Sequence, residues 1–221
     1  MQKMTDPSKR VSPFRAIEPL QPYIEGLVGS FGEIPEERKE AMAAMVGFIR
    51  DRVNSGAPCR LVFICTHNSR RSQFSQIWAR VAVSYYGIPG VETYSGGTET
   101  TACNERTIGA LRRAGFSIVN PSPGAGNPRY LVQFGEAEPP LELYSKVYSD
   151  PENPQDGYLA VMTCSDADEN CPIVTGCAER VSLTYVDPKL SDGTPEEAAT
   201  YDARCREIGR ELLFLMSQTK Q

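Results

Sequence analysis

The chain has 221 residues, with 23 Lys or Arg against 28 Asp or Glu, so its formal net charge is −5. This length suits one ordinary domain with an appendage, and the 40% hydrophobic share is typical of neither a disordered nor a membrane chain. The negative charge, without a stripe of basic residues, argues against nucleic-acid binding. No apolar run approaches the ~20 residues that a membrane-spanning helix needs.

One histidine and seven cysteines narrow the possible chemistry. A single histidine, His67, excludes a zinc site built on several imidazoles. Residues 1–7 lack the apolar segment of a secretory signal, so we expect the protein in the cytoplasm, where thiols stay reduced. Clustered cysteines there indicate catalysis, redox exchange or metal binding, although any one cysteine can equally be a small buried hydrophobe.

The first 57 residues predict an arm followed by a helix. Residues 1–31 contain four prolines and little periodic pattern, so we expect an extended arm on the surface. The prolines are Pro7, Pro13, Pro19 and Pro22. Apolar residues then recur at three- and four-residue steps between Pro35 and Val53, which predicts an amphipathic helix. We expect this helix to pack on the rest of the chain rather than on a partner protein.

Strand and helix patterns alternate in the next part of the chain. The expected strands are 61–64 and 91–95, and the expected helices are 72–86 and 104–114. The first strand is a continuous apolar run, as in a strand that is buried on both faces. This alternation is typical of a parallel sheet covered by helices on both sides.

Residues 120–157 interrupt that alternation. Asn120–Pro128 is crowded with proline and glycine, and residues 129–134 and 141–148 alternate apolar with polar side chains. This pattern predicts an antiparallel β insertion. The insertion is a candidate lid or partner-docking surface, or else a fixed structural insert.

The last third of the chain returns to the earlier pattern. We expect buried strands at 158–163 and 181–186 and a closing helix at 195–218, with Ala199 and Leu212 on its apolar side. The expected fold class is α/β, a three-layer sandwich with a central parallel sheet, an antiparallel β insertion and an N-terminal helical extension. We divide the chain into an arm and helix, 1–57, and a catalytic domain, 58–221.

A polar loop between the first strand and its helix has the composition of an anion site. It reads Cys65, Thr66, His67, Asn68, Ser69, Arg70, Arg71 and Ser72. Backbone N–H groups and the positive end of the helix converge there, which favours an oxyanion and stabilises the Cys65 thiolate. The planar fork of Arg71 could grip two oxygens of a tetrahedral anion, and Ser72 could donate a hydrogen bond to the sulfur.

A cysteine, five residues, then Arg-Ser, with Asn68 three positions after the cysteine, resembles the low-molecular-weight tyrosine phosphatase superfamily. The resemblance implies that Cys65 is the nucleophile, Arg71 the oxyanion ligand and Ser72 the partner of the thiolate. It also implies that Asn68 holds an unusual backbone turn. On the residues alone, a buried cysteine beside exposed arginines is the alternative.

The same resemblance assigns substrate binding to the loop, from Thr66 to Arg71. Two positions depart from the usual pattern: His67 stands where glycine is common, and Arg70 adds a second cation. Both change the expected width or charge of the anion pocket. We expect His67 to shape this pocket rather than to act as a base, because a thiolate stabilised by the loop needs none.

Asp187-Pro188 follows the last expected strand. The resemblance implies that Asp187 is the general acid that protonates the leaving oxygen. This role requires burial or the nearby anion to raise the pKa of its carboxyl group. Asp-Pro also begins ordinary turns, so this interpretation depends on the Cys65 loop in the same chain.

Cys164 and Cys171 lie seven positions apart, just beyond another expected strand. In a helix, Cα atoms so spaced lie about 10.5 Å apart, whereas a disulfide tolerates at most about 7 Å. If these cysteines pair, their segment must therefore be irregular or must refold on oxidation.

This segment, together with the Cys65 loop, resembles the thioredoxin-coupled arsenate reductases. The resemblance implies that the Cys65 thiolate attacks arsenate and that Cys164 attacks the adduct, which releases arsenite. Cys171 then resolves the disulfide and carries it to thioredoxin. The alternatives are a phosphatase acting on phosphotyrosine or small phosphate esters, and a non-catalytic redox sensor that uses the Cys164–Cys171 pair.

The reductase resemblance also suggests a potassium ion near Asn68 and Ser95, where Gln76 stands in place of the expected acidic ligand. We expect no other cofactor. The four remaining cysteines are expected to be buried or incidental, although Cys177 could pass electrons onward from Cys171. They are Cys59, Cys103, Cys177 and Cys205. A zinc site at the later cysteines is disfavoured because the chain has no Cys-x2-Cys pair.

Overall fold

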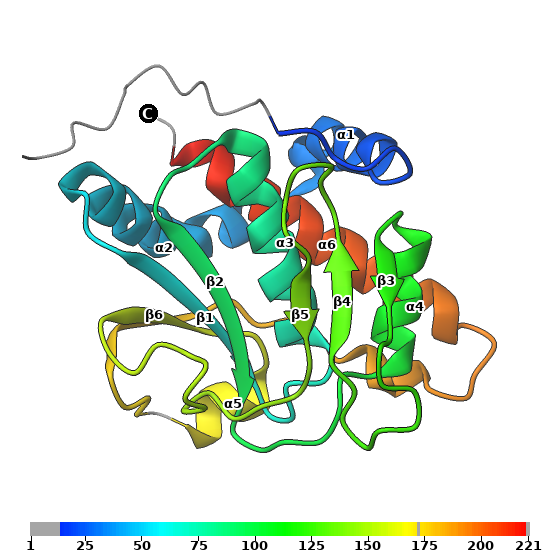
Figure 1. Cartoon of the computed structure of the whole chain (residues 1–221). Coiled ribbons are helices and arrows are strands. Elements are labelled where there is room, and N and C mark those ends of the chain that lie inside the picture. Colours follow the sequence, from blue (N-terminus) through cyan, green and yellow to red (C-terminus); the bar gives the residue numbers. More distant parts are fainter. Residues whose placement is uncertain (1–13, 172, 220–221) are drawn as a thin grey trace, which may run out of the picture.

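The computed structural model describes residues 14–171 and 173–219 of the chain. Its centre is a four-stranded sheet in the order β2-β1-β6-β7, in which every pair of neighbours is parallel. The strands are β1 (Cys59–Cys65), β2 (Val91–Gly97), β6 (Tyr158–Met162) and β7 (Cys177–Ser182). This arrangement confirms the α/β class with a central parallel sheet (Figure 1).

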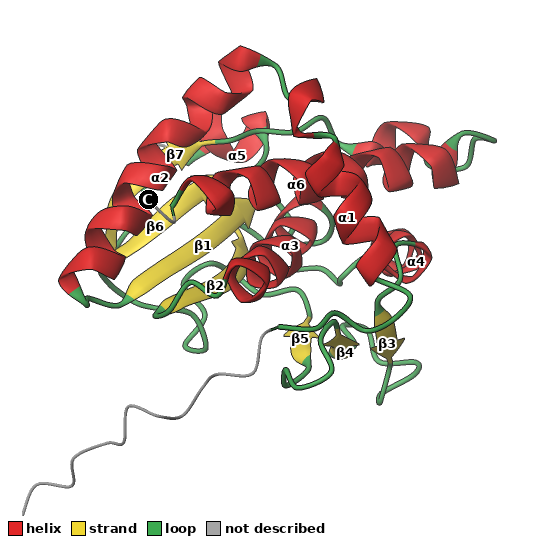
Figure 2. Cartoon of the chain, turned by 90° about the horizontal axis from the view of Figure 1, so that it is seen from above, coloured by secondary structure: helices red, strands yellow, loops and turns green. Residues whose placement is uncertain are grey.

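Five helices of eight residues or more occur in the described part of the chain. They are α1 (Gln21–Gly29), α2 (Glu36–Ser55), α3 (Arg71–Tyr86), α4 (Glu105–Arg113) and α6 (Glu197–Gln218). Leu61 and Phe63 of β1 face the large core, which they form with residues of α1, α2, α3 and α6. Figure 2 shows the sheet and these helices from above. None of the helices in residues 14–171 and 173–219 combines the length and apolarity needed to span a membrane.

The opposite face of the sheet has a thinner cover. Val62 and Ile64 of β1 join a small cluster with Ala167 of the short helix α5 (Ser165–Asn170) and with loop residue Val174. This second cluster also contains Cys65 and Cys164. Cys65 and Cys164 therefore lie at the less heavily covered side of the sheet.

The N-terminal region is more helical than expected. Where an extended arm was predicted, residues 21–29 form α1, so that prediction is wrong for this part. Pro22 lies in the first turn, where a missing N–H costs nothing, and Ile24 and Leu27 are fully buried. Pro7 and Pro13 lie outside the described residues, whereas the helix predicted between Pro35 and Val53 is confirmed as α2.

The β insertion is antiparallel, as predicted, but its boundaries differ. Three strands pair in the order β3-β4-β5, and they are β3 (Ser117–Val119), β4 (Tyr130–Gln133) and β5 (Leu141–Leu143). The extra strand β3 directly follows α4. The last strand ends at Leu143 rather than at Tyr148, because the chain beyond it crosses to the Cys65 loop.

Two predictions near the C-terminus need correction. The last parallel strand spans 177–182 instead of 181–186, since this stretch pairs with the full length of β6. The chain after it still bonds to the sheet, with Leu183 N donating to Met162 O at 2.9 Å. The closing helix begins at Glu197, and Ala199 is exposed because the apolar face starts one turn later.

Candidate active site

The loop between β1 and α3 is held by one residue in a left-handed conformation. Asn68 has φ +45°, and it is the one non-glycine residue with positive φ among those the structure describes. Asparagine tolerates this conformation better than most residues. Asn68 is also completely buried, so the turn is part of the packed interior.

Cys65 lies in a short chain of hydrogen bonds. Its Sγ is 3.0 Å from Ser72 Oγ, and Asn68 Nδ2 donates to the same oxygen at 2.9 Å. Because the serine oxygen already accepts from Asn68, its own proton is free to point at the sulfur. The structure therefore brings Cys65, Asn68 and Ser72 together, with the serine hydroxyl within hydrogen-bond distance of the sulfur.

Arg71 connects this loop to Asp187. Its Nη2 donates to Asp187 Oδ2 at 2.6 Å and its Nη1 to Tyr185 O at 3.0 Å. The Nε of Arg71 is buried and has no partner among the described residues. The arginine therefore anchors the candidate general acid beside the loop and retains one donor for a ligand.

Cys164 lies against the same loop. Thr66 Oγ1 is 3.5 Å from Cys164 Sγ and donates to Asp166 Oδ2 at 2.6 Å. Cys164 is the N-cap of α5, where its sulfur accepts from Ala167 N, and it is completely buried. Sequence reasoning missed the bridging role of Thr66, since its partners lie about a hundred residues away.

Cys171 lies at the opposite end of α5 and is half-buried. All seven thiols are free. The segment between Cys164 and Cys171 is helical. Cα atoms seven positions apart in a helix are separated by about 10.5 Å. A direct bond between these two sulfurs therefore requires α5 to unwind.

The remaining cysteines differ in burial. Burial raises the pKa of Cys59, Cys103 and Cys205 to about 12 in each case. Cys177 is half-buried at the start of β7, and burial raises the pKa of its thiol as well. No three His, Cys, Asp or Glu side chains within residues 14–171 and 173–219 are grouped to hold a metal ion.

The β insertion supports the loop from outside the sheet. Lys146 N donates to Asn68 Oδ1 at 2.9 Å, and Ser145 Oγ donates to His67 O at 2.9 Å. Gln73 Nε2 bonds both Asn68 O and Tyr144 O at 2.8 Å. No sequence pattern signalled these contacts, because they join segments about 70 to 80 residues apart.

Two of the residues suggested around the potassium ion, Ser95 and Gln76, lie side by side. Ser95 Oγ donates to Gln76 Oε1 at 2.5 Å, and both side chains are buried. Asn68 Oδ1 is already used by Lys146 N. The potassium ion stays a prediction, and no step below involves one.

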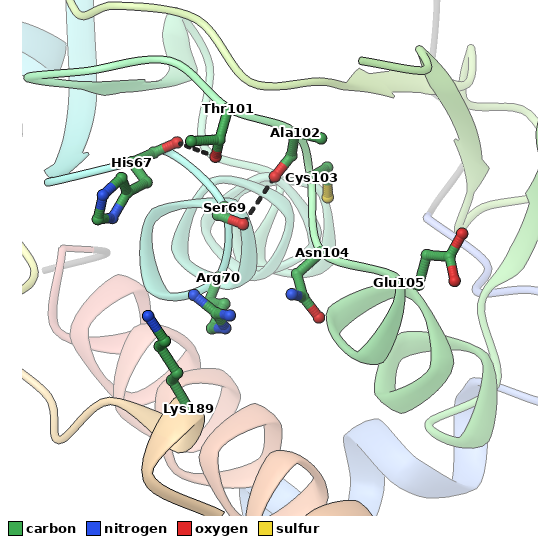
Figure 3. A pocket seen from close by; sticks show the side chains of 9 residues that line it. All are labelled: His67, Ser69, Arg70, Thr101, Ala102, Cys103, Asn104, Glu105 and Lys189. Atoms are coloured by element: carbon green, nitrogen blue, oxygen red, sulfur yellow. Dashed lines mark hydrogen bonds between the residues drawn. The ribbon is translucent and has the colours of Figure 1, made fainter. Parts of the chain in front are cut away.

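A hollow of about 400 Å³ lies on the outer side of the loop. Figure 3 shows the nitrogen ends of Arg70 and Lys189 turned towards each other in it, near Asn104. Arg70 is fixed by a hydrogen bond from its Nε to Tyr201 OH at 2.7 Å. His67 is half-exposed at the rim, with its Nε2 3.5 Å from a carboxylate oxygen of Glu99.

Several known proteins are similar to this chain, although no protein-family model matches it. Arsenate reductase of Bacillus subtilis (strain 168) is 29% identical over 153 residues, which cover 69% of this chain and 91% of that protein. Arsenate reductase 2 of Staphylococcus saprophyticus is 32% identical over 130 residues, which cover 58% of this chain and 77% of that protein.

Among solved structures, a low molecular weight phosphotyrosine phosphatase from Vibrio cholerae O395 aligns with 72% of this chain and 94% of its own. Its sequence identity is 13% and the TM-score is 0.47. The sequence relatives are the more informative comparison, since they align at about 30% identity over most of their own length. On their evidence, the chain belongs to the arsenate reductase family.

Proposed function

We propose that this protein reduces arsenate to arsenite through a relay of Cys65, Cys164 and Cys171, with thioredoxin or a similar dithiol as the final reductant. The main support is the position of Cys164, whose sulfur lies 3.5 Å from the hydroxyl of Thr66 in the Cys65 loop. Hydrolysis of a phosphate ester through one cysteine does not require a second thiol at this place, whereas reduction of arsenate does. The family of the chain supports the same activity.

The first step is substitution at arsenic. The Cys65 thiolate attacks As(V), and one As–O bond breaks as a proton from Asp187 allows the oxygen to leave as water. Arg71 and the N–H groups of the loop bind the remaining oxygens. The hydrogen bond from Ser72 stabilises the thiolate before this attack, at a sulfur-to-oxygen distance of 3.0 Å.

The next two steps are thiol exchanges. The Cys164 thiolate attacks the sulfur of Cys65, an S–S bond forms, and the electron pair of the broken S–As bond stays on arsenic, which leaves as arsenite. Cys171 then attacks the sulfur of Cys164 and releases the Cys65 thiolate. An external dithiol reduces the Cys164–Cys171 disulfide and supplies the two electrons that arsenic received.

The relay is tested by following arsenate-dependent NADPH oxidation with thioredoxin and thioredoxin reductase. Cys65→Ser, Cys164→Ser and Cys171→Ser should each abolish steady-state turnover, because each removes one thiol of the exchange. Cys177→Ser removes a half-buried thiol that the proposed relay does not use, so its turnover should be unchanged, and a loss would instead add Cys177 as the carrier of electrons from Cys171. If Cys164→Ser leaves arsenate turnover unchanged, the reductase mechanism is wrong.

A second candidate function is hydrolysis of a phosphate ester. It is favoured by the hollow of about 400 Å³ beside the loop, because arsenate carries no leaving group to fill it. Arg70 and Lys189 suit a leaving group that bears a negative charge. Hydrolysis of an aryl phosphate should then need Cys65 and Asp187 but survive Cys164→Ser. If Cys65→Ser changes neither assay, both enzyme functions are excluded.

A further inference from the structure

Helix α5 is too short to be stable on its own. It spans the six residues Ser165–Asn170, and Ala167 is the one residue in it that is buried. Isolated helices shorter than about 12 residues are marginal in water. The helical conformation of α5, which keeps Cys164 and Cys171 apart, must therefore depend on contacts with the rest of the protein.

The strongest of these contacts is made by Asp168. Arg180 Nη2 donates to Asp168 Oδ1 at 2.5 Å and to its backbone oxygen at 2.6 Å, and Ser182 Oγ donates to Oδ1 at 2.6 Å. The side chains of Asp168 and Arg180 are each 25% exposed, so water only partly screens the pair. Arg180 and Ser182 are two positions apart on β7, so both project from the same face of this strand.

The beginning of α5 is fastened separately. Asp166 accepts from Thr66 of the Cys65 loop at 2.6 Å, and Asn170 Nδ2 donates back to Asp166 Oδ1 at 3.1 Å. Cys164 is thus tied to the loop through Thr66, whereas the C-terminal half of the helix, which leads to Cys171, is tied to β7 through Asp168. For Cys171 to approach Cys164, the connection to β7 has to break together with the bonds inside α5, whereas the bond between Thr66 and Asp166 can stay.

We propose that Asp168 is a positioning residue for the redox step, because its bonds to Arg180 and Ser182 keep α5 wound and hold Cys171 away from Cys164. Breaking these bonds allows α5 to unwind, and the frequency of this opening limits the rate of Cys164–Cys171 disulfide formation. This inference rests on the relay proposed above. It adds that contacts with β7, the edge strand of the sheet, control the rate at which the Cys164–Cys171 disulfide forms.

The test measures disulfide formation without arsenate. In a Cys65→Ser background, diamide accepts the two electrons and two protons of a thiol pair, and peptide mapping identifies the Cys164–Cys171 bond. Asp168→Asn should accelerate its formation about fivefold, as expected from the loss of one charge-assisted interaction. Glu169→Gln is the matched control, because it removes the same charge from an exposed neighbouring position of α5, and its rate should equal that of the parent.

Two further measurements separate positioning from general destabilisation. Amides 167–171 should exchange hydrogen faster in Asp168→Asn than in Glu169→Gln, whereas Asp168→Glu should restore part of the protection. Hydrolysis of an aryl phosphate by the variant with Cys65 intact should be unchanged. Equal disulfide rates and equal exchange in Asp168→Asn and Glu169→Gln would overturn the role of Asp168.

The outcome also distinguishes this inference from the relay itself. If the parent forms no Cys164–Cys171 bond under diamide, the relay is wrong, and the exchange experiment alone then decides whether Asp168 stabilises α5. If the bond forms at the same rate in all variants, the relay survives and the role of Asp168 is rejected.

Discussion

At the scale of single residues, Asn68 joins the backbone of the Cys65 loop to its chemistry. Its left-handed conformation reverses the chain, its amide donates to Ser72, and its carbonyl oxygen accepts from Lys146. An amide side chain supplies a donor and an acceptor together, and no hydrophobic residue could replace both. The orientation of the Ser72 hydroxyl towards Cys65 depends on this arrangement.

Replacement of Asn68 should separate the backbone contribution from the hydrogen bonds. Asn68→Gly keeps the left-handed turn but removes both side-chain bonds, so we expect kcat/KM for arsenate to fall about tenfold. Asn68→Ala adds a backbone cost of about 1–2 kcal/mol, so its kcat/KM should fall about a hundredfold. Steady-state kinetics on both variants measure the difference. Equal losses would show that the backbone conformation contributes nothing.

The residue pattern predicted part of this site. Cys65, Asn68 and Ser72 lie within eight positions of each other, so their relation is local and visible in the sequence. The contacts of Thr66 with Asp166 and of Asn68 with Lys146 depend on how distant segments fold together. The roles of Arg71 and Asp187 remain predictions, although the structure places the two side chains 2.6 Å apart.

At the scale of elements, a largely buried ion pair links α2 to α6. Arg38 donates from Nε and Nη2 to both carboxylate oxygens of Glu211, at 3.0 and 2.6 Å, and from Nη1 to Thr184 O at 3.1 Å. The Glu211 side chain is only 3% exposed. The N-terminal helix is therefore fastened to the closing helix by a bidentate contact as well as by apolar packing.

Breaking this pair should destabilise the whole protein. Arg38→Met leaves the buried carboxylate of Glu211 without its partner, so we expect a loss of about 2–4 kcal/mol in the free energy of unfolding. Urea denaturation measures this loss. The double variant Arg38→Met/Glu211→Leu should recover most of it. Arg113→Met, which breaks an exposed pair with Asp202, should cost less than about 1 kcal/mol.

Helices with a clear hydrophobic periodicity were predicted well. Helices that are stabilised by contacts with distant parts of the sequence were not. Helices α2, α3 and α4 follow from apolar spacing within each segment. Helix α1 was missed because its prolines resemble those of an extended arm, while its stability comes from Ile24 and Leu27 packing into the main core. Helix α5 has almost no apolar face, so no periodic signal could reveal it.

At the scale of the whole molecule, the thiols divide by location. Cys59, Cys103 and Cys205 belong to the main core, whereas Cys65 and Cys164 lie in the small cluster on the opposite face of the sheet, with Cys171 packed against it. Four of the cysteines were expected to be buried or incidental, and three of them are fully buried. Alternation along β1 does not explain this division, because Cys59 and Cys65 are six positions apart and a regular strand would place both on one face. Cys65 lies in the small cluster because the strand ends there and the chain turns into the loop.

Alkylation should reveal this division directly. Burial raises the pKa of Cys59, Cys103 and Cys205 to about 12, so near pH 8 only about one molecule in ten thousand carries any one of these thiols as a thiolate. Iodoacetamide should therefore leave them unmodified in the native protein and label them in urea, while Cys171 should react in both conditions. Mass spectrometry of digests checks the result. If Cys59, Cys103 and Cys205 were labelled in the native protein as fast as Cys171, this prediction would be wrong.

The support that the β insertion gives to the Cys65 loop limits how far this chain can be shortened. The turn at Asn68 takes one of its hydrogen bonds from the backbone of Lys146, which lies just beyond β5. A version shortened by deleting residues 120–157 would leave the buried Oδ1 of Asn68 without the backbone N–H of Lys146 as its donor. The Cys65 loop of this chain thus depends on its insertion, and we expect the shortened version to lose activity.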